Sequence, residues 1–431
     1  MNDWSLFSGK YAQLLPCSIQ PKTDELFSSW LVRLAYSHHS KSHSFYKLLF
    51  PKVNLWNRDI DKIAPDEFIK QLSIKTLSSY QTIFNTTLRS YEGKLYLNHN
   101  PNGNTRWLMP LGIYHREHKN YGLMFCPKCL KNDGDTPYFR KQWRLSFSVI
   151  CSKCGVYLHD RCPNCGKPIV FFRIELGKKN ELPSKSIAIC YHCDFDLRET
   201  LTVQAPVKLT RGQRTFYRIL QEGWNKEIIY PHQYFDVVYQ LLKVLKSSSI
   251  RCRKLQNDLA VRFGTQEVIM DLISEKRSFE YLPLHLRIIL LKQIWWLLGD
   301  IEGHFITVAK YHNVTSFVLF NDLDYRPFWF EKLVMEHFFV SNVNRKFLKI
   351  YIPEEQQNQV VAPLKGMRGP SRKILEGFEC PRCKSNWIIK DGMRSGVKRF
   401  KCRDCGKRIQ ESMRVDSPTA YHLRALKSIN D

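Results

Sequence analysis

The cysteines of this 431-residue chain are almost all paired in sequence: twelve of the fourteen fall into six Cys-x-x-Cys pairs, and only Cys17 and Cys252 stand alone. Two thiols separated by two residues are suited to hold one tetrahedral metal ion, whereas disulfide frameworks of secreted proteins rarely consist of such pairs. The pattern therefore predicts zinc sites in a reducing compartment. The pairs are Cys126/Cys129, Cys151/Cys154, Cys162/Cys165, Cys190/Cys193, Cys380/Cys383 and Cys402/Cys405.

The spacing between pairs predicts how they share metal ions. There are 21 residues between the first and second pairs, 24 between the third and fourth, and 18 between the last two, but only seven between Cys154 and Cys162. Sequential pairing thus predicts three zinc ions, each held by four thiolates. A cross-braced arrangement, in which the first pair joins the third and the second joins the fourth, uses the same ligands and stays open. Four thiolates leave no position for a water nucleophile, so we expect structural sites.

The charge of the chain points to a polyanionic partner. Lys and Arg total 66 against 40 Asp and Glu, a formal net charge of +26. An excess this large favours nucleic acid as the ligand. The stretch 1–15 lacks the pattern of a signal peptide, and the longest apolar run, 288–298, is short for a membrane span and contains Lys292. We therefore expect a cytoplasmic protein with no membrane segment.

The N-terminal part shows helical periodicity. Thr23 is placed to cap a helix in which Leu26, Trp30 and Leu34 recur at four-residue spacing, so one face should be buried. Two shorter helices are predicted at 66–72 and 76–84, around a turn at Ser73-Ile74-Lys75. This is the outline of a helix-turn-helix, although helical hairpins are also common in protein cores.

Residues 125–198 predict short strands and turns around the cysteines, and helices resume beyond Pro206. Apolar periodicity predicts helices over 235–245, 255–273 and 284–298. A second helix-turn-helix is predicted over 306–323, where Ala309, Asn313 and Leu319 supply a small residue, a left-handed turn residue and an apolar contact. Its candidate DNA contacts are Thr315 and Ser316.

The C-terminal stretch is a separate basic module. The prolines and glycines of 362–370 predict a linker, and residues 365–431 contain seventeen Lys and Arg against seven Asp and Glu, a net +10. Strand-forming residues from Trp387, a turn at Asp391-Gly392 and a return strand through Phe400 predict a zinc ribbon between the last two cysteine pairs. Its density of cations favours contact with phosphates. The candidate contacts are Arg394, Lys398, Arg399, Lys401, Arg403, Lys407 and Arg408.

Several motifs stand out over about the first 200 residues: GLMFCPKCL (122–130), PYFRKQWRLSFSVICSKCGVYLHDRCPNCGKPI (137–169), Leu15-Pro16, DELFSSWLVRLA (24–35), Trp56 and Arg58-Asp59-Ile60-Asp61. Together they resemble the TniQ/TnsD family of transposon target selectors. Many members carry a histidine where Cys154 stands, and both side chains bind zinc. The segment from Thr315 to Trp329 looks like the less regular second helical half of that family, and the terminal ribbon is similar to ribbons of some insertion-sequence transposases.

The resemblance implies a non-enzymatic role in a bacterial cytoplasm, associated with the nucleoid: such proteins mark an insertion site and recruit an AAA+ ATPase of the TnsC type. TnsD-like members bind a DNA attachment site themselves, whereas shorter TniQ members ride on an RNA-guided CRISPR effector (Cascade), often as dimers. The basic ribbon and the second helix-turn-helix favour direct recognition of double-stranded DNA. A general zinc-ribbon transcription factor is a further alternative, which would share the charge and the cysteines without the N-terminal resemblance.

The predicted fold class is mainly α with small zinc-ribbon and zinc-finger β elements, divided among several domains. No phosphate-binding glycine loop, HExxH motif or nucleophile elbow is evident, so we do not expect an enzyme. The expected domains are an N-terminal helical TniQ-like domain (1–120), a tandem zinc-finger region (121–200), a second helical domain (201–362) and a basic C-terminal zinc ribbon (363–431).

Overall fold

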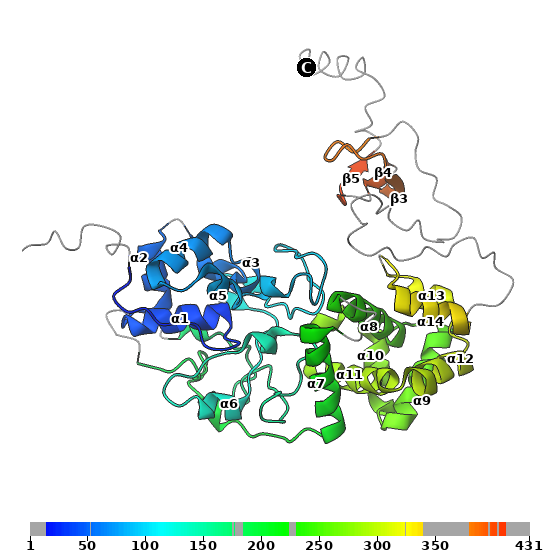
Figure 1. The fold of residues 1–431 in the computed structure, drawn as a ribbon, viewed down its shortest axis with the longest axis horizontal. Helices are drawn as coiled ribbons and strands as arrows, with labels where there is room; N and C mark the ends of the chain where they lie inside the picture. Colours follow the sequence, from blue (N-terminus) through cyan, green and yellow to red (C-terminus); the bar gives the residue numbers. More distant parts are fainter. Residues whose placement is uncertain are drawn as a thin grey trace, which may run out of the picture. The chain divides into compact units, whose positions relative to one another are not determined.

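A computed structural model describes residues 14–338, apart from 52, 175, 177–183, 224–229 and 324, and residues 379–410, apart from 395–396 and 403–404. The chain divides into two compact units, Met1–Val361 and Ala362–Asp431. The first unit is helical with irregular zinc-finger segments, and the second is a small antiparallel sheet (Figure 1). The predicted fold class, mainly α with small β elements, is confirmed.

Five helices form the N-terminal part of the first unit: α1 (Phe27–Ser37), α2 (Ser42–Leu49), α3 (Ile60–Ile63), α4 (Asp66–Thr76) and α5 (Tyr80–Phe84). The predicted stripe of α1 is buried, since Leu26, Trp30 and Leu34 are fully inaccessible. The predicted cap at Thr23 is wrong. Asp24 has a φ of 55°, and the first turn of α1 is instead satisfied from α3, whose Asp61 accepts hydrogen bonds from the Ser28 backbone N (2.6 Å) and Oγ (2.9 Å).

The first predicted helix-turn-helix needs correction. Residues 73–75 form no turn, because α4 continues to Thr76, whose Oγ1 donates to the Leu72 carbonyl (2.8 Å). The break comes at Leu77, which has a φ of 54°, and Ser79 then caps α5 through its Oγ and the Thr82 backbone N (3.0 Å). A left-handed leucine is unusual, so composition gave no sign of this turn.

The middle of the first unit has little regular structure, as expected for 125–198. It contains β1 (Ile113–Tyr114) paired antiparallel with β2 (Glu117–His118), the helix α6 (Pro127–Asn132), short 3-10 turns and isolated bridges. Without long strands or helices, its backbone is held mainly by turns and by the cysteine clusters described below.

Helices resume as predicted, and each has boundaries set by local residues. The predicted helix 255–273 is split, because Gly264 has a φ of 64° and ends one helix before a 3-10 turn starts the next. Among the described helices, none is both long and apolar enough to cross a membrane. The elements are α7 (Val207–Glu222), α8 (Pro231–Leu245), α9 (Ile250–Phe263), α10 (Ile269–Ser274), α11 (Leu284–Gly299), a π-helical turn (Ile301–Ile306), α12 (Thr307–Tyr311), α13 (Ser316–Phe320) and α14 (Phe328–Phe338).

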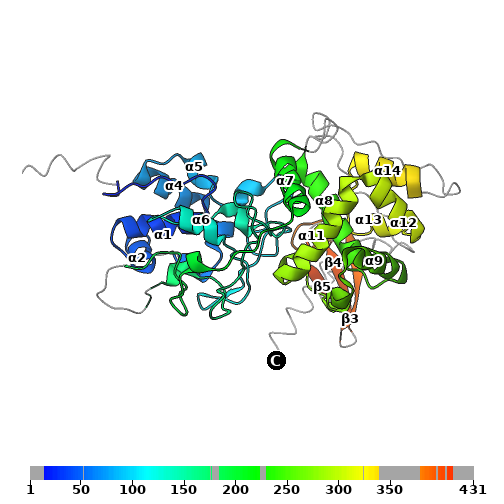
Figure 2. The same cartoon turned by 90° about the horizontal axis from the view of Figure 1, so that it is seen from below.

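One hydrophobic core runs through the described part of the first unit. Helices α1–α5 lie at one end and α8–α14 at the other, with α7 between them in both views (Figures 1 and 2). Trp107 joins the two ends. It is fully buried, its backbone N donates to Glu280 (2.7 Å), and four rings meet its indole edge-on at 5.4 to 5.9 Å: Phe147, Phe235, Tyr239 and Phe279.

The second unit contains a three-stranded antiparallel sheet in the order β3 (Ile388–Arg394), β4 (Val397–Cys402) and β5 (Arg408–Gln410). The predicted strands at Ile388 and Phe400 are present. The predicted turn at Asp391-Gly392 is wrong: both residues lie within β3, where the register with β4 shifts between Lys390 and Met393. A bulge and a turn draw on the same residue types, so the sequence could not separate them.

Candidate metal centres and nucleic-acid interface

The first cysteine cluster is built by one helix start and one turn. Cys126 caps α6, with its Sγ 3.5 Å from the backbone N of Cys129, and the second pair lies in a turn closed by a hydrogen bond from Gly155 N to Cys151 O (2.9 Å). Cys129 Sγ lies 3.4 Å from Cys151 Sγ and 3.5 Å from Cys154 Sγ. The first and second pairs therefore face a common centre.

The second and third clusters repeat this arrangement. Sulfur atoms lie 3.6 Å apart between Cys162 and Cys193 and 3.8 Å apart between Cys165 and Cys190. In the ribbon, the sulfur atoms of Cys380 and Cys405 lie 3.5 Å apart, as do those of Cys383 and Cys402. The structure thus adopts the sequential pairing, and the cross-braced alternative is wrong.

These clusters fit zinc. Within each, the four sulfur atoms lie within 4.8 Å of one another, and all the cysteines are free of disulfides. A zinc ion with four sulfur ligands at about 2.3 Å places neighbouring sulfurs about 3.8 Å apart, whereas a disulfide bond measures about 2.05 Å. The observed sulfur separations match zinc coordination. Three structural zinc ions, each closed by four thiolates, account for the donor sets.

Five of the six pairs share a backbone device that the sequence analysis missed. The residue four positions after the first cysteine of the pair has a positive φ and donates its N–H to the carbonyl of that cysteine, at 2.9 to 3.1 Å. Glycine suits this conformation best and fills three of the positions. The sequence signal for this turn was the glycine that directly follows three of the cysteine pairs. The five residues are Gly155, Gly166, Asp194, Lys384 and Gly406.

A buried ion-pair network ties the segment around Arg144 to the N-terminal helices. Arg144 is fully buried and lies 2.6 Å from Asp59 and 3.0 Å from Asp61, and it also donates to the Met109 carbonyl (2.9 Å). Asp61 in turn holds the first turn of α1 at Ser28. A buried charge with several partners fixes geometry strongly, because loss of one partner leaves the other uncompensated. The acidic motif at 58–61 is therefore a structural clamp.

Six of the seven candidate DNA contacts of the ribbon lie on its small sheet or directly beside it. Arg399 and Lys401 flank the buried Phe400 on β4, and the exposed Lys407 directly precedes the exposed Arg408, which begins β5. Asp391 offsets part of this charge, since its carboxylate lies 3.1 Å from Arg408 and 3.6 Å from Arg399. Arg394 ends β3 and Lys398 lies on β4, while Arg403 lies outside the described residues.

The second predicted helix-turn-helix has its expected outline. Asn313 has a φ of 53° between α12 and α13, and Ala309 and Leu319 are buried. Thr315 precedes α13 and Ser316 begins it, and both are partly exposed. However, α13 has only five residues, which is short for a helix that reads a groove. DNA contact by Thr315 and Ser316 stays a prediction.

Comparison with known families gives one match. Residues 16–158 match the TniQ family model. The predicted resemblance to the TniQ/TnsD family is confirmed over this segment, about a third of the chain. A TniQ domain indicates a role in transposition, as a target selector or adaptor. No curated protein matches the chain.

The TniQ segment coincides with a structural assembly. It contains α1–α6, the whole first cysteine cluster and the Arg144 network, and it ends just before the second cluster, whose first ligand is Cys162. The second cluster, the later helices and the ribbon lie outside the match. What this protein adds to a TniQ segment is therefore a second zinc site, a helical half and a basic ribbon.

Proposed function

We propose that this protein selects target sites in DNA transposition without catalysing a reaction: it binds target DNA itself and recruits an AAA+ regulator of the TnsC type. The carrying observation is the combination of a TniQ segment with a third tetra-cysteine cluster in a basic ribbon beyond it. The first supports a role in transposition. The second supports direct contact with DNA, which an adaptor riding on another complex would not need.

The metal sites support a non-catalytic role. Each of the three clusters supplies four thiolates, so a bound zinc ion keeps no open position at which to activate water or polarise a phosphate. In the first two clusters most of the cysteines are buried in the main core, where they stabilise the fold. Zinc there contributes to folding free energy.

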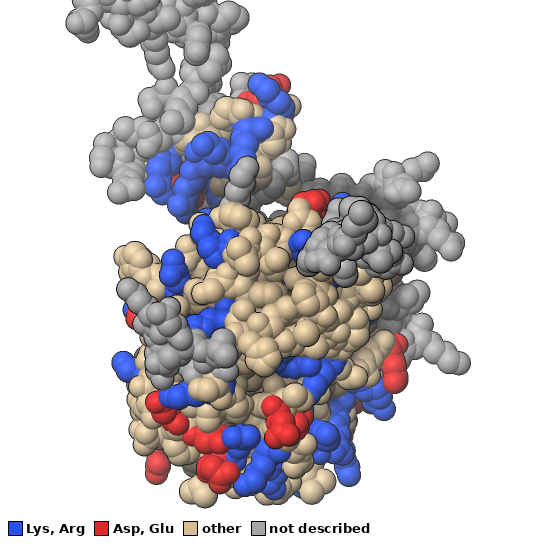
Figure 3. All heavy atoms as spheres, turned by 90° about the vertical axis from the view of Figure 1, so that its left-hand side faces the viewer, with Lys and Arg blue, Asp and Glu red and all other residues tan. Residues whose placement is uncertain are grey.

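The ribbon is proposed to contact the phosphate backbone of double-stranded DNA. In the view of Figure 3, Lys and Arg outnumber Asp and Glu on its described surface. Arg408 and Lys407 are exposed, and Arg399 and Lys401 are partly exposed. Contacts of this kind position a protein on DNA and weaken steeply with salt, because each neutralised phosphate releases counterions.

The N-terminal helices are proposed to present the surface for the AAA+ regulator. Large apolar side chains are exposed there, including Leu48 (80%), Leu77 (71%) and Ile74 (53%). Figure 3 shows a face of this unit on which a broad area carries neither cations nor carboxylates. Exposed apolar groups of this kind favour a protein partner over a polyanion.

Footprinting on DNA that flanks the element tests this function. Full-length protein should protect a defined site in the absence of guide RNA and should retain the AAA+ regulator on that DNA. Protection only in the presence of a CRISPR effector and its guide would favour the adaptor alternative. DNA binding without any association with the regulator would favour a zinc-ribbon transcription factor.

Two variants test whether the ribbon contacts DNA. Removing residues 363–431 should lower DNA affinity while the first unit, which has its own core, stays folded. The double variant Lys401→Gln and Lys407→Gln should lower affinity and salt dependence without loss of zinc, because neither side chain is a ligand. Unchanged affinity in both variants would exclude the ribbon from DNA binding.

A further inference from the structure

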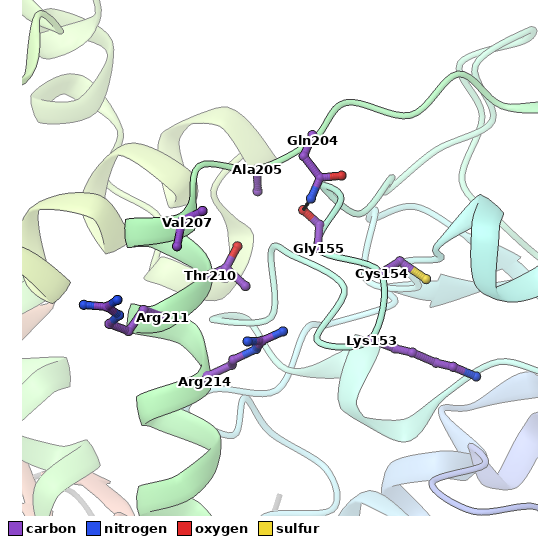
Figure 4. Close-up of a pocket in the computed structure, with 9 residues that line it drawn as sticks. All are labelled: Lys153, Cys154, Gly155, Gln204, Ala205, Val207, Thr210, Arg211 and Arg214. Carbon is purple, nitrogen blue, oxygen red and sulfur yellow. Dashed lines mark hydrogen bonds between the residues drawn. The ribbon is translucent and has the colours of Figure 1, made fainter.

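A cavity of about 370 Å³ lies between the first zinc cluster and the start of α7. Its walls come from the Lys153–Gly155 turn, the Gln204–Ala205 segment and the first two turns of α7 (Figure 4). Gln204 closes one wall by donating from Nε2 to the Gly155 carbonyl (3.0 Å), and this Nε2 lies 2.6 Å from the position that a Cβ of Gly155 would take. Three cations line the cavity: Lys153, Arg211 and Arg214.

The cations belong to a longer basic face. Helix α7 turns one side inward, where Leu209, Gln213 and Phe216 are buried. Its other side is cationic and exposed, within an arc of about 120° at 3.6 residues per turn. The one carboxylate of α7, Glu222, also falls in this arc, at the C-terminal end of the helix and one turn beyond Arg218. The cations of α7 are Lys208, Arg211, Arg214 and Arg218.

These cations have no carboxylate partners among the described residues, unlike several other arginines of this unit. Arg140, for example, lies 2.6 Å from Asp133, and Arg33 lies 2.6 Å from Glu25. The start of α7 also lacks a side-chain cap, so its first N–H groups add partial positive charge to the same place. Several unpaired cations around a concave site favour an anionic ligand with several charges.

The basic face is held rigidly against the zinc cluster. Gln213 Oε1 accepts hydrogen bonds from the backbone N of Val149 (2.8 Å) and Ile150 (2.9 Å), and its Nε2 donates to the Ile150 carbonyl. One turn further, the hydroxyls of Tyr217 and Ser148 lie 2.6 Å apart. Ile150 directly precedes the ligand Cys151. Lys153 and the arginines of α7 therefore keep a fixed spacing, as recognition of a regular polyanion requires.

We propose that this face, consisting of Lys153, Lys208, Arg211, Arg214 and Arg218, binds the phosphate backbone of target DNA. The inference rests on the proposed function and adds a second contact, separate from the ribbon. From Lys208 to Arg218 the helix rises about 15 Å, which spans roughly four phosphates of one strand along the duplex axis. The face contacts phosphates without reading bases, so it contributes affinity and register and no sequence preference.

The test uses the full chain and a 30-base-pair duplex. The triple variant Arg211→Gln, Arg214→Gln and Arg218→Gln keeps helix propensity while removing three charges. If each charge neutralises one phosphate, the slope of log K against log salt falls by about 0.9 per charge. When salt is raised from 50 to 200 mM, the fold-loss of affinity should therefore be smaller in the variant than in the wild type by a factor of about 40.

A control of equal charge is available on α9, where Arg251, Arg253 and Lys254 are exposed and have no ion pairs within the described residues. Changing all three to glutamine removes the same net charge elsewhere and should keep the wild-type slope. Equal slopes for the wild type and the α7 variant would overturn the inference while leaving DNA binding by the ribbon intact. A wild type that binds no DNA would overturn the proposed function itself.

Two further measurements exclude other purposes of the face. A tetra-thiolate zinc site carries a net charge of about −2, which nearby cations could offset. If the α7 variant holds fewer than three zinc ions per chain and its salt slope is unchanged, the cations serve to offset the charge of the zinc site. Binding of a poly-glutamate peptide that is lost in the variant, with DNA binding unchanged, would instead assign the face to an acidic protein partner. Three zinc ions and a reduced slope support the proposal.

Discussion

The close approach of α7 to α11 can be tested at Gly212. A Cβ at this position would lie 2.6 Å from Cγ, 2.7 Å from Cδ2 and 2.8 Å from Cβ of Trp295, closer than real Cβ atoms come to other atoms. These atoms form the base of a side chain that is only 9% exposed, so it cannot swing away. Replacement of Gly212 by alanine must therefore shift α7 or Trp295.

Two opposing effects set the magnitude. Alanine is favoured over glycine in a helix interior by about 0.5–1 kcal/mol, whereas overpacking of a core costs about 1–3 kcal/mol. We expect Gly212→Ala to lower the free energy of unfolding by about 1–2 kcal/mol. In urea, with a slope of about 2–3 kcal/mol per molar, the midpoint should fall by about 0.5 M. Tryptophan fluorescence in zinc-containing buffer follows the transition.

Gly299 provides the matched control. It ends α11, and a Cβ there would meet nothing within 4 Å, so Gly299→Ala should leave the midpoint unchanged or raise it slightly. In a Trp295→Leu background, Gly212→Ala should lower the free energy of unfolding by less than it does in the wild type. The difference between the two costs, which is the coupling free energy, should be at least about 1 kcal/mol. If Gly212→Ala is as stable as Gly299→Ala, the packing argument for the placement of α7 is refuted.

Three other predictions concern the metal, the pH and the ribbon. Cys402→Ser should reduce zinc from three to two per chain by elemental analysis and leave the first unit folded; loss of all three would contradict separate folding. Burial lowers the pKa of His118 from 6.5 to about 4 in the folded protein. As the pH falls, this histidine is therefore protonated in the unfolded chain before it is protonated in the folded one, and the free energy of unfolding should fall by about 2 kcal/mol between pH 7 and pH 5. His118→Asn, which can still donate to the Ile169 carbonyl, should remove this part of the decline in urea titrations, and an unaltered pH dependence would count against it. Asp391→Asn frees Arg408, so DNA affinity should rise and the salt slope should steepen by up to about 0.9; a weaker complex would contradict the pairing.

The metal sites were predictable because their determinants are local. A Cys-x-x-Cys pair needs only one turn to aim both sulfurs at one ion, and the short gap between Cys154 and Cys162 favoured two separate sites, although it left the cross-braced pairing open. Helices α8 and α11 followed for a similar reason, since their apolar periodicity is complete within each helix. In these places neighbouring residues carry most of the information.

The failures arose where distant residues decide. The start of α1 depends on Asp61, which is 33 residues away from Ser28, and no local rule could prefer it over Thr23. The basic stripe of α7 was visible as cations three and four residues apart, but whether a cation is paired depends on carboxylates brought by the fold. The same holds in the ribbon, where Asp391 pairs with Arg399 and Arg408, two of the side chains predicted to contact DNA.

Zinc has different consequences in the two units because their cores differ in size. The small cluster of the ribbon consists of Ile388, Phe400 and Ile409 with two of its own ligands, Cys380 and Cys402. A core this small cannot offset the conformational entropy of ordering the sheet without metal. In the first unit, by contrast, the ligands are embedded in a core that extends from α1 to α14. Partial chelation should therefore unfold the ribbon first and remove its phosphate contacts, while the basic face of α7 keeps its geometry. Residual DNA binding after partial chelation would then report the contribution of α7 alone.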